Sequence, residues 1–170
     1  MFIKLLLISQ LFVTSIYTLH FTDINGNTIQ LSNYQGKKIL FVNTASNSLY
    51  TSQYAQLEQL YQQYHDSLVV IAFPSNSFGN EPDSDATIKD FVDSNYHAHF
   101  ILASKVSVSG NDISPVWQWL TKARENGAMD NSVDTDFFKY LVNENGMLVA
   151  AFTGSVEPMS DQVKNVVEAW

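Results

Sequence analysis

The sequence predicts an α/β domain with a central mixed β-sheet that is flanked by helices and preceded by an N-terminal β-hairpin. The segment 67–74 ("SLVVIAFP") is almost continuously apolar and β-branched, which is typical of a strand buried on both faces. A second apolar run covers 38–42. Between them, the apolar residues of 52–65 recur at helical spacing. Strand, helix and strand of these lengths predict two parallel strands with a right-handed crossover.

The other elements are predicted from turn and helix-start signals. A hairpin is expected over 21–31, because Asn25-Gly26 is a typical two-residue hairpin turn. Pro115 is well placed to open a helix. The remaining expected elements are a helix over 86–95, a short strand over 99–104, an antiparallel hairpin turning at 145–146, and a final helix over 158–170.

Composition limits the possible functions. A chain of 170 residues without long linkers or repeats is expected to form one domain. Seventeen acidic residues against nine basic ones give a net charge of −8, which argues against a nucleic-acid partner, since phosphate binding needs clustered Lys and Arg. The chain has no cysteine, so disulfides, thiolate metal sites and thiol redox chemistry are excluded.

The N-terminus has the pattern of a secretory signal. Lys4 precedes an apolar run over 5–13, and smaller, more polar residues follow. The run is too short to span a bilayer, so no stable membrane span is expected after cleavage. We therefore expect a signal peptide over 1–18, one domain over 19–170, and export to a periplasm or to the exterior. The alternative is a buried first strand or helix.

The stretch "ILFVNTASNSLYTSQY" (39–54) combines a strand, a polar turn and a predicted helix start near Thr51. Backbone N–H groups at a helix start favour negative charge, so this turn suits an ionised nucleophile. The residue in that place is Ser48. A serine hydrolase would also need a histidine base, yet neither His20 nor His65 is well placed, and there is no Gly-x-Ser-x-Gly motif.

Several strings, in this order, resemble the glutathione peroxidase family, which has a thioredoxin-like fold. They are "LSNYQGKKILFVNTAS", "YTSQYAQLEQLYQQY", "AFPSNSFGNEP", "KVSVSGNDISPVWQWL" and "TDFFKYLVNENG". The resemblance extends from about Phe21 to Trp170. It implies a thioredoxin-like α/β fold for nearly the whole chain after the predicted signal.

The functional residues of that family are replaced. The resemblance implies a peroxidatic cysteine or selenocysteine after the first core strand, surrounded by Gln, Trp and Asn. The corresponding positions here are Ser48, Ser77, Thr135 and Asp136. Ser75 replaces the cysteine of the family's Phe-Pro-Cys-Asn loop. The helix that carries a resolving cysteine in some members has Phe91, Val92 and Asp93 instead.

These replacements predict a member without thiol peroxidase chemistry, because a serine hydroxyl stays protonated and has no comparable reversible oxidation cycle. We expect a binding or interaction protein whose unidentified small-molecule or protein partner occupies the remaining pocket. Ser75 and Asn76 are expected to line that pocket with the four replaced positions. No cofactor and no metal are expected. The alternative is a functioning oxidoreductase that reduces hydroperoxides in oxidative stress by unrecognised chemistry.

Two further patterns have simpler explanations. His97 and His99 lie two residues apart and would share a face of an extended segment, but two ligands without a third make a weak metal site. The acidic residues near the middle of the chain lack the spacing of a calcium loop. In the "DSDA" segment (83–86), Ser84 or Asp85 is expected to cap a helix.

Overall fold

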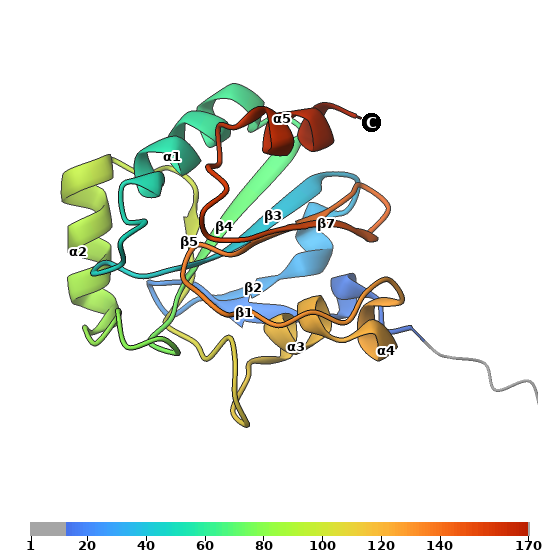
Figure 1. The fold of residues 1–170 in the computed structure, drawn as a ribbon, viewed down its shortest axis with the longest axis horizontal. Helices are drawn as coiled ribbons and strands as arrows, with labels where there is room; N and C mark the ends of the chain where they lie inside the picture. Colours follow the sequence, from blue (N-terminus) through green and yellow to red (C-terminus); the bar gives the residue numbers. More distant parts are fainter. Residues whose placement is uncertain (1–12, 170) are drawn as a thin grey trace, which may run out of the picture.

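The computed structural model describes residues 13–169, and its centre is a five-stranded mixed sheet (Figure 1). The strands are β3 (Lys38–Thr44), β4 (Leu68–Pro74), β5 (Ile101–Leu102), β6 (Lys139–Val142) and β7 (Leu148–Phe152), in the order β5-β4-β3-β6-β7. Strands β3, β4 and β5 are parallel, whereas β6 and β7 run antiparallel to their neighbours. The predicted parallel pair and the predicted C-terminal hairpin are therefore confirmed.

The predicted N-terminal hairpin is also present. Strands β1 (His20–Thr22) and β2 (Thr28–Gln30) pair antiparallel and form a separate two-stranded sheet. The Asp23 carboxylate stabilises the turn, because its Oδ1 accepts from the backbone N–H groups of Asn25 and Asn27 at 2.9 and 2.8 Å. Two short 3₁₀ helices, η1 (Ile16–Thr18) and η2 (Leu31–Tyr34), were not predicted.

Five α-helices are found in the described part of the chain. They are α1 (Gln53–Tyr64), α2 (Asp85–Tyr96), α3 (Pro115–Thr121), α4 (Ala123–Asn126) and α5 (Asp161–Glu168). Ser84 caps α2 as expected, since its Oγ accepts from the backbone N–H of Thr87. The four-residue helix α4 was not predicted.

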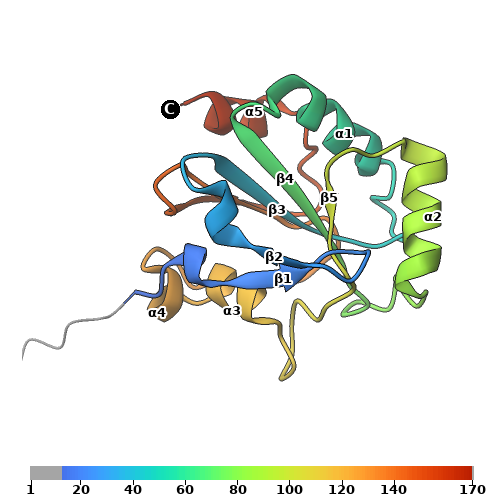
Figure 2. The same cartoon turned by 180° about the vertical axis from the view of Figure 1, so that it is seen from behind.

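Alternate residues of the central strands supply two separate cores. Ile39 and Phe41 of β3 pack with Trp117 of α3 and with Phe21 of the hairpin. Their neighbours Leu40 and Val42 pack in the other core, beneath α1, α2 and α5. Figures 1 and 2 show this layered arrangement from opposite sides, with α1 and α5 on one side of the sheet and the hairpin and α3 on the other.

The segment just before β1 is part of the folded domain. Ile16 is fully buried in the core beneath the hairpin. Trp119 Nε1 donates to the carbonyl of Thr14 at 2.6 Å, and Thr14 N donates to the carbonyl of Glu125 at 3.1 Å. Residues 1–12 of the predicted signal peptide lie outside the described residues, so the signal and its boundary stay predictions. None of the described helices has the length and apolarity needed to cross a membrane.

Candidate functional site

The predicted site residues lie at the carboxyl ends of β3 and β4 and in the segment before β6. Ser75 N donates to the carbonyl of Thr44 at 2.9 Å, so the two strand ends lie side by side. Asn43 Nδ2 donates to the carbonyl of Thr135 at 3.1 Å, and Asn43 Oδ1 accepts from Phe138 N at 2.7 Å. These bonds fix the segment that carries Thr135 and Asp136 against the end of β3.

Ser48 lies in the turn after β3 and is nearly buried, with 6% of its surface exposed. Its Oγ accepts from the backbone N–H of Tyr50 at 3.2 Å. The helix α1 begins only at Gln53, after a series of turn hydrogen bonds such as Thr51 N to the Ser48 carbonyl at 3.2 Å. In the described residues no side-chain hydrogen bond joins Ser48 to a histidine. The geometry is therefore that of a serine closing a local turn rather than an activated nucleophile.

Ser75, Asn76 and Ser77 form a second part of the site. Ser75 is fully buried, and its Oγ donates to Ser77 Oγ at 3.0 Å. Ser77 Oγ also accepts from Val108 N at 3.1 Å, so this hydroxyl anchors the loop that follows β5. Asn76 and Ser77, together with Lys105 to Ser107 and the 109–112 turn, line a polar cavity of about 520 Å³. We call it the polar cavity.

Asp136 is 2% exposed and has one hydrogen-bond partner, Asn80, whose Nδ2 donates to Oδ2 at 2.6 Å. The other oxygen, Oδ1, is buried without a partner. No Lys or Arg of the described chain forms an ion pair with this carboxylate. Asn80 also accepts from Asn47 N through its carbonyl at 3.1 Å. It therefore connects the turn that carries Ser48 to Asp136.

Gly154 allows the loop after β7 to close over this region. A Cβ at this position would lie 2.2 Å from the carbonyl oxygen of Asp136 and 2.9 Å from Thr135 Cγ2. Gln53 Nε2 donates to the Gly154 carbonyl at 2.7 Å. Because a backbone atom cannot move aside as a flexible side chain can, only glycine fits this close approach.

A second buried carboxylate, Glu81, lies under the same turn. It is fully buried, and its Oε2 accepts from the N–H and the hydroxyl of Ser46 at 2.7 and 2.8 Å. Its Oε1 has no partner. Burial raises the pKa of Glu81, with the Ser46 bonds acting in the opposite direction. Burial also raises the pKa of Tyr54, with the charges of Glu81 and Asp136 acting in the same sense.

The structure thus brings the predicted residues into two groups. The turn of Ser48 and the Asp136 carboxylate are joined through Asn80, whereas Asn76 and Ser77 face the polar cavity. Its lining residues do not include Ser48, Ser75, Thr135 or Asp136, although all four were expected to line one pocket with Asn76 and Ser77. Asn80 and Glu81 were not singled out from the sequence. Glu81-Pro82 stands in one of the quoted strings, but no pattern in the sequence indicates that both side chains bond to this site.

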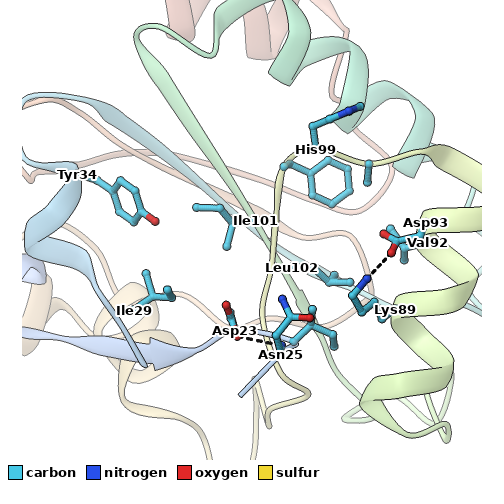
Figure 3. Close-up of a pocket in the computed structure, with 13 residues that line it drawn as sticks. Asp23, Asn25, Ile29, Tyr34, Lys89, Val92, Asp93, His99, Ile101 and Leu102 are labelled. Carbon is cyan, nitrogen blue, oxygen red and sulfur yellow. Dashed lines mark hydrogen bonds and ion pairs between the residues drawn. The ribbon is translucent and has the colours of Figure 1, made fainter. Parts of the chain in front are cut away.

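The weaker candidates are separate from the site. His97 has a left-handed backbone (φ 47°) at the end of α2, and His99 Nδ1 lies 2.8 Å from Glu58 Oε1. Within the described residues, no group of three or more His, Cys, Asp or Glu side chains is arranged to hold a metal. His99 borders another cavity of about 300 Å³, between the hairpin, β5 and α2, where Lys89 pairs with Asp93 (Figure 3).

The Asp136 geometry leads to a stability prediction. We expect Asp136→Asn to raise the free energy of unfolding by about 1–3 kcal/mol. The variant removes a buried negative charge that has no ion-pair partner, while its amide oxygen still accepts from Asn80 Nδ2. Urea unfolding at pH 7 measures the change. The matched control is Asp90→Asn on the exposed side of α2, which should stay within about 0.5 kcal/mol of the wild type. A less stable Asp136→Asn variant would show that a charge is needed there.

Comparisons with known proteins agree with the fold and the quoted strings. Residues 16–121 match the family model described as glutathione peroxidase. The glutathione peroxidase-like peroxiredoxin gpx1 of Schizosaccharomyces pombe is 36% identical over 155 residues, which cover 90% of this chain and 96% of that protein. A glutathione peroxidase of Lactococcus lactis is 33% identical over 155 residues, covering 89% and 98%.

Two solved structures are similar to this chain in their overall fold. The apo form of Trgpx is similar with a TM-score of 0.70 and 30% identity, covering 91% of this chain and 94% of that one. A thioredoxin-family thiol:disulfide interchange protein from Chlorobium tepidum has a TM-score of 0.67 at 10% identity, covering 92% and 95%. At that identity the likeness concerns the fold alone, and it supports a thioredoxin-like architecture.

Proposed function

The chain belongs to the glutathione peroxidase family, and we propose that it is an exported member that has lost thiol peroxidase chemistry and acts by binding a partner. The observation that carries the proposal is the replacement of the peroxidatic position by Ser48 in a chain without any cysteine. No thiolate is available to attack a peroxide bond, and no second thiol is available to resolve the product.

The surroundings of Ser48 support this proposal. Its hydroxyl is held in a local turn by Tyr50 N, and the region beneath holds two buried carboxylates, Glu81 and Asp136. A negative charge near a thiolate opposes its ionisation, so this environment is poorly suited to the family's chemistry. The four family positions have all changed, as expected of a site that is no longer selected for peroxide reduction.

The polar cavity is the binding site that we propose for the partner. It opens beside Asn76 and Ser77, at the carboxyl ends of parallel strands, where ligands commonly bind in α/β sheets. Its lining offers hydroxyl, amide and backbone groups together with Lys105 and Asp112. Such a lining favours a small polar molecule or a polar loop of a protein.

The proposal predicts a specific result in peroxidase assays. With glutathione or thioredoxin as the reductant, the wild-type protein should consume hydroperoxides no faster than the Ser48→Ala variant does. Neither the wild type nor this variant contains a cysteine that could supply a thiolate. Ser48→Cys alone should gain little, since the Gln, Trp and Asn positions are missing. The double variant Ser48→Cys with Asp136→Asn should have a lower thiol pKa than the single variant, because the nearby carboxylate is gone.

Peroxide consumption by the wild type that disappears in Ser48→Ala would overturn the loss of activity and favour the alternative, an active oxidoreductase. The names of the relatives make that alternative worth testing, since they describe glutathione peroxidases and peroxiredoxins. Equal thiol pKa values in the single and double cysteine variants would contradict the role given to Asp136.

A further inference from the structure

A third cavity, of about 530 Å³, lies between β1 and the start of α3. Figures 1 and 2 both show these two elements side by side. The volume is within the range of small-molecule sites. Its lining shares Lys105 and Val106 with the polar cavity but includes none of the four family positions. We call it the aromatic cavity.

The floor of the aromatic cavity is built from aromatic and aliphatic side chains. Phe21 and Phe73 line it with ring centroids 5.2 Å apart and an interplanar angle of 59°. Phe73 in turn meets Trp117 edge to face at 5.8 Å. Val116 borders the same space. Another aromatic ring placed here would extend a stack that already has the preferred tilted and edge-to-face geometries.

One polar group in the lining has no partner. Ser114 stands at the N-cap of α3, yet its hydroxyl accepts no backbone N–H of that helix. Its Oγ is buried and has no hydrogen-bond partner in the described structure. A buried hydroxyl without a partner is unfavourable, and a ligand oxygen in the cavity would satisfy it.

The charges of the lining select the type of ligand. No Asp or Glu lines the aromatic cavity, although the chain carries a net charge of −8. Its ionisable lining residues are Lys105 and His20. The Lys105 ammonium donates to the carbonyls of Glu81, Pro82 and Asp83, which lie outside the lining, so the side chain of Lys105 borders the cavity while its charge is directed to that loop. An anionic group is therefore tolerated here, whereas a cation meets no counter-charge.

We propose that the aromatic cavity binds small molecules with one aromatic ring and a terminal carboxylate, of the phenylalkanoate class. The ring packs against Phe21 and Phe73, and an oxygen accepts from Ser114. This binding is independent of the partner proposed for the polar cavity, because Asn76 and Ser77 take no part in it.

The test uses 3-phenylpropanoate with the full chain at pH 7.5, measured by calorimetry and by saturation-transfer NMR. Two probes separate the contributions of ring and charge. Octanoate keeps the carboxylate without the ring, and 3-phenylpropylammonium keeps the ring with the opposite charge. We expect saturable one-to-one binding of 3-phenylpropanoate and at least fivefold weaker binding of both other probes.

Three variants locate the site. Thr22→Trp places a large ring at an exposed position that lines the cavity, and it should weaken binding at least tenfold. Ser114→Ala should weaken it several-fold without harming α3, because its hydroxyl makes no capping bond. The control Thr87→Trp, on the exposed side of α2, should bind as the wild type does.

Absence of saturable binding by 3-phenylpropanoate would overturn the proposal. So would binding that Thr22→Trp and Ser114→Ala both leave unchanged, because the ligand would then lie elsewhere. If octanoate bound as tightly as 3-phenylpropanoate, the proposed contribution of the aromatic ring would be wrong. If 3-phenylpropylammonium bound as tightly as 3-phenylpropanoate, the proposed contribution of the negative charge would be wrong.

Discussion

A chain that begins at Leu19 is expected to be about 3–8 kcal/mol less stable than one that begins at Val13. The shorter chain loses the Ile16 side chain from the core beneath the hairpin, and deleting a buried aliphatic side chain typically costs about 2–5 kcal/mol. It also leaves Trp119 Nε1, which donates to the Thr14 carbonyl, without that partner, at a further cost of about 1–3 kcal/mol. Whole domains of this size are stable by only about 5–15 kcal/mol.

The measurement is urea unfolding of the two truncated chains, 13–170 and 19–170. The point variant Ile16→Ala in the full chain is the matched control, and it should lose about 2–5 kcal/mol by the cavity term alone. Equal stability of the two truncated chains would mean that 13–18 contributes nothing to the stability of the fold.

Because Thr14 and Ile16 contribute to the folded domain, we propose that any signal cleavage falls before Thr14 rather than near Thr18. Mass spectrometry of the exported protein would test this.

This N-terminal segment illustrates where sequence patterns lose information. The strands β3 and β4 and the helix α1 were predicted because their apolar residues follow a regular pattern over seven to twelve positions. Ile16 is a single apolar residue among small and polar neighbours, so the same letters fit the end of a signal peptide. The neighbouring Thr14 is bound by Trp119 and Glu125, more than a hundred residues away, and no local pattern contains those contacts.

The candidate site shows the same limit. The turn holding Ser48, the loop of Ser75 to Ser77 and the segment of Asp136 could be placed together because the resemblance to the glutathione peroxidase family assigns all of them to one site. The linking role of Asn80 could not, since it depends on one amide reaching Asp136 while its carbonyl binds Asn47. The separation of Ser48 from the polar cavity is likewise a matter of side-chain direction, which periodicity does not specify.

Lys139 gives the second large effect, a rise in stability with pH across the alkaline range. This lysine is fully buried on β6, and its Nζ donates to the Phe137 carbonyl at 2.6 Å. Burial lowers its pKa to about 7, with the charge of Glu157 acting in the opposite direction. In the unfolded chain the pKa is near the ordinary value of about 10.4.

The sign of the effect follows from proton binding. Below pH 7 the lysine is protonated in both states, and the full penalty of burying the charge is present. Between about pH 7 and 10.4 the unfolded chain keeps the proton while the folded chain has lost it, so stability rises with pH. The whole difference corresponds to about 5 kcal/mol at 1.36 kcal/mol per pH unit, and about 2–3 kcal/mol of it falls between pH 7.5 and 9.5. Burial raises the pKa of Tyr54 and Tyr140 above the ordinary tyrosine value, so their opposing effect begins only near pH 10.

Urea unfolding at pH 7.5, 8.5 and 9.5 tests this prediction. Lys139→Met should abolish the rise, because the buried amine that titrates is gone, even though the Phe137 carbonyl loses its donor. Lys122→Met, at an exposed position, should keep the wild-type slope. A wild-type protein whose stability is flat over this range would mean that Lys139 stays charged when buried. Its positive charge would then be held by Glu157 and the Phe137 carbonyl, close to the backbone that carries Asp136.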